Sequence, residues 1–158
     1  MNGKIYALFG IISPLVTYFS IGISIWFSPW FSWHQNALSD LGHSVKSEVA
    51  PIFNLGLLLS GFLIVVYAVT VYRKHAKYTS ICLVASASIL QLVATFDEVY
   101  GLLHNMVATL FFLSIWVTSV VNAVEKRSPP ALLAFIVGLG SWLLYAMNVY
   151  RAGIAVPE

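Results

Sequence analysis

Five long apolar stretches, none interrupted by a charged side chain or a histidine, constrain this chain more than any other feature. They cover residues 5–27, 51–72, 78–96, 105–124 and 131–150. Each is close to the ~20 residues that an α-helix needs to cross the hydrocarbon core of a bilayer. Inside a bilayer, a helix satisfies all of its own backbone hydrogen bonds. The sequence therefore predicts an all-α integral membrane bundle of five transmembrane helices, forming a single domain over residues 1–158.

The composition agrees with a membrane protein and excludes other classes. Charged residues make up 9% of the chain, against about 25% in soluble domains. The net charge of +2 is too small and too dispersed for a nucleic-acid-binding protein. The single cysteine, Cys82, excludes an intrachain disulfide and a cysteine-based zinc site.

The basic residues predict the orientation of the bundle, because the cytoplasmic loops of membrane proteins carry an excess of lysine and arginine. A cytoplasmic N-terminus places most of them inside: Lys4, Arg73, Lys74, Lys77, Lys126 and Arg127. Lys46 and Arg151 then lie outside together with nearly all of the acids: Asp40, Glu48, Asp97, Glu98 and Glu158. We therefore expect a multi-pass protein of the cell membrane whose C-terminus faces outward.

Three tryptophans mark the outer end of the first span. Trp26, Trp30 and Trp33 are four and three residues apart, which places them on one side of a helix if the helix continues. Tryptophan rings favour the headgroup layer of a bilayer. The sequence predicts an interfacial aromatic outer loop, helical over SPWFSWHQ, that binds lipid. A ring-lined groove for lipid tails or for a sugar is the alternative.

Side chains that could carry chemistry gather in two outer loops. The catalytic candidates are Ser39, Asp40, Asp97, Glu98 and His104. The metal-ligand candidates are His34, Asp40, His43, Asp97 and His104, whose imidazoles and carboxylates suit zinc or another divalent ion. Their spacing matches no zinc motif, and no other cofactor is expected. A serine hydrolase triad of Ser39, His104 and Asp97 matches in residue types but lacks a G-x-S-x-G elbow.

Helix capping and tight turns explain the same residues without any reaction. Ser39 or Asp40 can accept hydrogen bonds from the free amides at the start of a helix, and Gly42 permits a tight turn. Asp97 and Glu98, shortly before Gly101, are typical of a solvated hairpin tip. Elsewhere, the patterns Gly56-x-x-x-Ser60 and Ala134-x-x-x-Gly138 predict close contacts between membrane helices.

The first outer loop also carries a family resemblance. Ser39-Asp40-Leu41-Gly42, followed by Pro51-Ile52-Phe53-Asn54 at the start of a span, resembles the prokaryotic multi-pass membrane proteins grouped as domain of unknown function 998. Residues 153–158, GIAVPE, resemble the ending of archaeal members. That family is distantly similar to eukaryotic membrane proteins of autophagy modulation and GPI-lipid remodelling, which share a Ser-Asp-x-Gly loop. The resemblance implies a small helical bundle without an established activity. Family members often have a sixth span after the Pro-Glu at which this sequence stops, so either this member is short or the chain is truncated.

Two functions from different classes fit these observations. The first is a non-catalytic bundle that binds membrane lipid, or that serves as an accessory subunit in a homo-oligomer or a larger membrane complex. The second is an enzyme of the outer leaflet, a metal-dependent lipid hydrolase built on the histidines and aspartates. The sequence favours the first, because the second requires side chains of both loops to converge.

Overall fold

The computed structural model of the chain describes residues 3–147 and 154–157. This part is helical and contains no strand. The long helices are α1 (Gly3–Trp26), α2 (Ala50–Thr70), α3 (Lys77–Thr95), α4 (Leu102–Lys126) and α5 (Pro129–Ala146). Three short 3-10 helices lie in the connections: η1 (Leu38–Gly42), η2 (Tyr72–Lys74) and η3 (Glu98–Tyr100).

The five long helices confirm the predicted membrane spans. Each is long and apolar enough to cross a bilayer, and their bounds fall within a few residues of the predicted ones. The end of the predicted fifth span, Arg151, and the first and last residues of the GIAVPE ending, Gly153 and Glu158, lie outside the described part of the chain. The chain is a multi-pass membrane protein by the length and apolar character of these helices.

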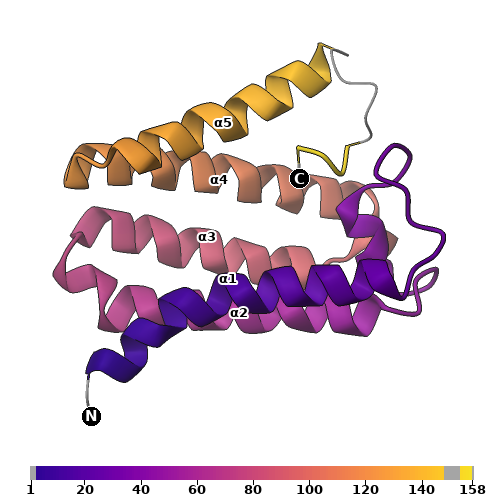
Figure 1. Ribbon diagram of the computed structural model, residues 1–158, viewed down its shortest axis with the longest axis horizontal. Coiled ribbons are helices and arrows are strands. Elements are labelled where there is room, and N and C mark those ends of the chain that lie inside the picture. The colour runs from indigo at the N-terminus through magenta and orange to yellow at the C-terminus, as the bar shows by residue number, and fades with distance from the viewer. Residues whose placement is uncertain (1–2, 148–153, 158) are drawn as a thin grey trace.

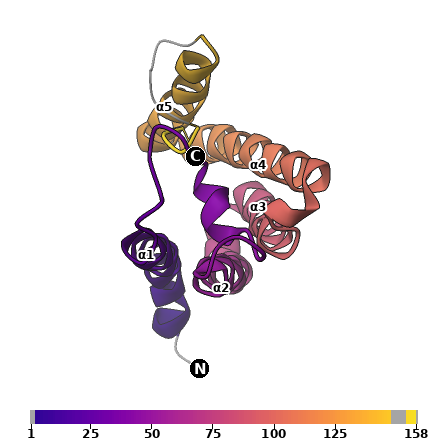
Figure 2. The same cartoon turned by 90° about the vertical axis from the view of Figure 1, so that its right-hand side faces the viewer.

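The helices form a row that curls around the middle of the bundle. Each long helix packs against the next one along the chain, and α5 diverges from α4 toward one end (Figure 1). Viewed from that end, η1 lies between α1 and the pair formed by α4 and α5 (Figure 2). The first loop therefore covers one end of the bundle, which we call the η1 end.

Both polar turns lie at the η1 end. The 3-10 helices η1 and η3 contact each other, and the basic segment η2 lies at the opposite end of the bundle together with the α4–α5 turn (Figure 1). This arrangement confirms that the two turns with the candidate residues emerge on the same side. Which side faces the cytoplasm stays a prediction.

Small side chains bring α1 and α2 close together. Gly56 lies directly against Ser20, with no room for a Cβ atom. One turn further along, the Ser60 hydroxyl lies 2.7 Å from the Ser13 hydroxyl and accepts a hydrogen bond of 2.7 Å from Thr17. Hydrogen bonds between membrane helices contribute about 0.6–2 kcal/mol each. The predicted small-residue pattern on α2 is confirmed as a helix contact.

The contact between α4 and α5 uses larger rings. A Cβ atom on Gly138 would lie 3.4 Å from Nε1 of Trp116, so the second small-residue pattern also faces a neighbouring helix. The rings of Phe112 and Trp142 meet with their centroids 5.0 Å apart. Ser128 caps the start of α5 by accepting a hydrogen bond from a backbone amide.

The residues that carry the family resemblance hold η1 in place. Leu41 is completely buried, and its carbonyl accepts a hydrogen bond of 2.8 Å from Ser47. The carbonyl of Gly42 accepts a hydrogen bond of 2.9 Å from the Asn54 amide. A Cβ atom on Gly42 would lie 2.9 Å from the Phe53 ring and 2.6 Å from Asn54. Gly42 is thus required for space between the loop and α2.

Replacing Asn54 with alanine is expected to lower the free energy of unfolding by about 1–3 kcal/mol, because the Gly42 carbonyl loses its partner. Titration with SDS in mixed micelles measures this change. Asn105→Ala is the matched control, since the Asn105 residue is exposed and should change stability by less than about 0.5 kcal/mol. Equal losses in both variants would contradict the role of Asn54.

The aromatic segment after α1 differs from the prediction. The helix ends at Trp26, and the residues that follow form turns. Pro29 explains the end, because the residue before a proline is disfavoured in α-helical backbone. Phe31 packs edge-to-face between Trp30 and Trp33, with ring centroids 6.3 and 5.4 Å apart. The predicted helical continuation is wrong, whereas the three tryptophans are exposed; their contact with lipid stays a prediction.

Candidate functional site: a cavity beneath η1

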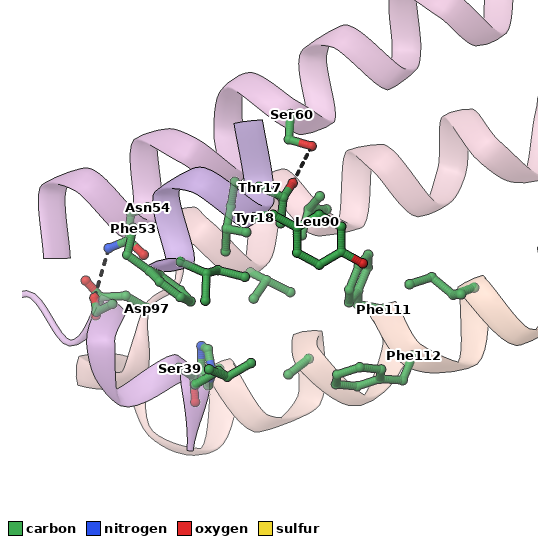
Figure 3. A pocket seen from close by; sticks show the side chains of 18 of the residues that line it. Thr17, Tyr18, Ser39, Phe53, Asn54, Ser60, Leu90, Asp97, Phe111 and Phe112 are labelled. Atoms are coloured by element: carbon green, nitrogen blue, oxygen red, sulfur yellow. Dashed lines mark hydrogen bonds between the residues drawn. The ribbon is translucent and has the colours of Figure 1, made fainter. Parts of the chain in front are cut away.

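A cavity of about 420 Å³ lies inside the bundle beneath η1. Side chains from the first four long helices and from η1 line it (Figure 3). Its volume falls within the 300–1,000 Å³ that is usual for small-molecule sites. Most of the lining is hydrophobic, with Leu57 on α2, Leu90 on α3 and Phe111 on α4 as central members.

The cavity reaches the side of the bundle between α1 and α4. Tyr18 of α1 lines the cavity although the residue is 72% exposed. Ile115 of α4 lines it too and is also exposed. Figure 3 shows the Tyr18 ring extending toward Phe111 across the space. In a membrane, this side of the bundle faces lipid chains.

Polar side chains gather where the cavity meets η1. Ser39, Asn54, Asp97 and His104 all line it there, and Figure 3 shows the first three. Asp97 is only 7% exposed, and one of its oxygens accepts a hydrogen bond of 2.8 Å from the Val99 amide. The Ser39 hydroxyl has no hydrogen bond to another residue within 3–147 or 154–157. The cavity is therefore mostly apolar, with these four polar side chains at its η1 end and the hydrogen-bonded pair Thr17 and Ser60 further along.

His104 is held on both sides of its ring. Nδ1 lies 2.7 Å from the Phe96 carbonyl, and because a carbonyl only accepts, Nδ1 carries the hydrogen. Nε2 lies 3.1 Å from Oε2 of Glu98, close in distance but not aligned as a hydrogen bond. The His104 residue is 4% exposed. Its ring is therefore tied to the turn between α3 and α4.

These contacts do not form the hydrolase triad that the residue types allowed. Ser39, Asp97 and His104 line one cavity, as a convergent site requires. Among the described residues, however, no hydrogen bond joins any two of them, and the His104 nitrogens face the Phe96 carbonyl and Glu98. The buried position of Asp97 also shows that the predicted solvated hairpin tip is wrong.

The metal-ligand candidates are divided between two places. Asp40 caps η1 by accepting hydrogen bonds of 3.0 Å from the Asn36 side chain and the Ala37 amide, so its predicted capping role is confirmed. Nδ1 of His43 lies 3.3 Å from a backbone amide two residues later, and His34 is exposed. Within the described ranges, no three histidine, cysteine or acidic side chains lie close enough to hold a metal ion.

A second cavity, of about 490 Å³, lies behind His104 between α4 and α5. Ser39 and His104 line both cavities and form part of the wall between them. Two buried polar atoms on the second cavity, Nε1 of Trp142 and Oε2 of Glu98, have no hydrogen-bond partner in the described part of the chain. This space is more polar at the η1 end, like the first.

Sequence reasoning did not find the cavity itself. Its apolar lining comes from four helices. In the sequence, an apolar residue that lines the cavity cannot be distinguished from an apolar residue of the same span that faces lipid. Asn54, a polar residue one turn inside α2, was the usable signal, because it marks the end of the cavity. Tyr18 carried no distinguishing pattern.

The chain was compared with known protein families and structures. The sequence model of one family, described as "Protein of unknown function (DUF998)", matches residues 11–153. The matched region includes every residue that lines the first cavity. No significant match was found among curated proteins or among solved structures. The distant similarity to eukaryotic membrane proteins stays a prediction.

Proposed function

The chain belongs to the DUF998 family of proteins of unknown function, and from the geometry of its cavity we propose that it binds a single-chain membrane amphiphile without catalysing a reaction. The hydrocarbon chain lies in the apolar cavity, and the head group lies at the polar end beneath η1. The observation that carries this proposal is the joining of one apolar space to one polar end.

In a bilayer, the binding free energy of an amphiphile depends strongly on the polar end of the cavity. Lipid tails are as apolar as leucine side chains, so moving a chain from the bilayer into the cavity gains little from the hydrophobic effect. Binding must therefore come from close packing and from hydrogen bonds to the head group. Ser39 and Asp97 retain hydrogen-bonding capacity at that end, because Ser39 has no partner within the described ranges and Asp97 accepts one backbone bond.

The lateral position of the cavity supports entry from the membrane. Tyr18 and Ile115 border the space on α1 and α4 while remaining exposed on the side of the bundle. A chain in the surrounding lipid can enter between these helices without crossing the polar end. The head group then stays at the depth of η1.

The hydrolase alternative has weaker support. A general base must lie within hydrogen-bond reach of the group from which it takes a proton. His104 instead has one nitrogen on the Phe96 carbonyl and the other beside Glu98. The same contacts suit a fixed wall between the two cavities.

Photolabelling tests the proposal. Protein in a maltoside detergent is irradiated with dodecanol that carries a diazirine at the end of its chain, and the labelled peptides are identified by mass spectrometry. We expect label on buried cavity residues such as Leu57 and Leu90, each 7% exposed, and competition by unlabelled dodecanol. Label confined to exposed residues on the outside of the helices, with no effect of competitor, would overturn it.

A further inference from the structure

We propose that the polar end of the cavity selects a positively charged head group, a primary ammonium above all, and rejects anionic heads. This inference rests on the proposed function and names the class of amphiphile that the site takes. It follows from the charge that the structure buries there.

Asp97 is the carboxylate on which the inference depends. It is 7% exposed and lines the cavity. Among the described residues, its carboxylate has one hydrogen bond, which comes from the Val99 amide and engages a single oxygen. Removing a carboxylate from water is costly unless a cation or several donors compensate for the lost hydration. In the described part of the chain, the buried Asp97 carboxylate has no positively charged partner to offset this cost.

No neighbouring cation fills this role among the described residues. His104 also lines the cavity, but its Nε2 lies 3.1 Å from a Glu98 oxygen and its Nδ1 lies at the Phe96 carbonyl, so neither nitrogen is paired with Asp97. No lysine or arginine within residues 3–147 or 154–157 lines the cavity. Lys46, in the same loop as η1, is exposed.

The remaining groups at this end suit an ammonium. A primary ammonium carries three hydrogen-bond donors. Three acceptors line the same end of the cavity: the Asp97 carboxylate, the Ser39 hydroxyl oxygen and the Asn54 amide oxygen, whose own NH₂ group donates to the Gly42 carbonyl. A hydroxyl head supplies a single donor and no charge, so it should bind more weakly.

Anionic heads meet the opposite situation. A phosphate or carboxylate would enter beside Asp97, where the described lining residues include no lysine or arginine. Like charges placed together in a site discriminate strongly against a ligand. The cavity is thus selective through both attraction and repulsion.

The test uses four photoprobes that share one dodecyl chain with a terminal diazirine and differ in the head group: ammonium, hydroxyl, carboxylate and phosphate. Labelling of the Leu57 peptide at neutral pH is divided by labelling of Leu133, an exposed residue of α5, to correct for partitioning. We expect the ratio to be highest for the ammonium and at least about tenfold lower for both anions, since charge-assisted hydrogen bonds are about twice as strong as neutral ones.

Asp97→Asn should remove most of the ammonium preference, because asparagine keeps the acceptor for the Val99 amide but carries no charge. Glu48→Gln removes one carboxylate charge from an exposed position in the loop between η1 and α2 and should leave the preference unchanged. Equal ratios for all four probes in the wild-type protein would overturn this inference while leaving lipid binding intact. Absence of label at Leu57 with every probe would overturn the proposed function as well.

Discussion

Replacing Gly56 with leucine is expected to lower the free energy of unfolding by about 3 kcal/mol, the largest stability effect that this structure predicts. The glycine lies directly against Ser20 of α1, so that even a Cβ atom would overlap it. A larger side chain must push α1 away from α2. That movement would also break the hydrogen bond from Thr17 to Ser60. Titration with SDS in mixed micelles provides the measurement.

Gly22→Leu is the matched control for this variant. Gly22 lies on α1 with nothing within 4 Å of a Cβ atom. Adding the same side chain there should change stability by no more than about 0.5 kcal/mol. Similar losses from both substitutions would mean that leucine is harmful for reasons unrelated to the contact between α1 and α2.

Replacing Leu57 with tryptophan is expected to reduce dodecanol labelling of the Leu90 peptide by at least about tenfold, equivalent to about 1.4 kcal/mol of binding free energy. Leu57 lines the cavity and is 7% exposed. An indole at this position extends into the space that the chain would occupy. The existing cavity provides the volume for the ring, so the fold should persist, as size-exclusion chromatography can verify.

Leu59→Trp separates occlusion of the cavity from a general effect of tryptophan. Leu59 belongs to the same helix, is 50% exposed and does not line the cavity. Its substitution should leave labelling of the Leu90 peptide unchanged. If both variants label like the wild-type protein, the chain does not lie beside Leu57.

The membrane architecture could be predicted because each membrane-spanning helix depends only on the apolar character of one continuous stretch of sequence. Charged residues are excluded from runs of about 20 apolar residues, and only helices satisfy their backbone there. In the structure, Pro51 lies in the first turn of α2 and Pro129 begins α5, positions where the missing N–H of a proline costs no hydrogen bond. The contact between Gly56 and α1 was also predictable, since small residues four apart favour close approach.

The site was less predictable because it depends on how helices are rotated against one another. In the sequence, the pair Asp97–Glu98 predicts a solvated hairpin tip. In the structure, the Asp97 carboxylate is buried and the Glu98 carboxylate lies beside His104. No local pattern distinguishes a tip that folds back under η1 from one that extends into water. Likewise, nothing in the α1 sequence shows that Tyr18 borders a cavity.

The proposed function requires that a hydrocarbon chain occupy the space beneath η1. Its most direct test is a crystal structure grown from a lipidic mesophase with dodecanol brominated at the end of the chain, using anomalous scattering to locate the bromine. We expect a bromine peak inside the bundle, on the Ile64 side of the cavity, with the hydroxyl near Asp97. Bromine peaks found only on the outer faces of the helices, with no chain density in the cavity, would contradict it.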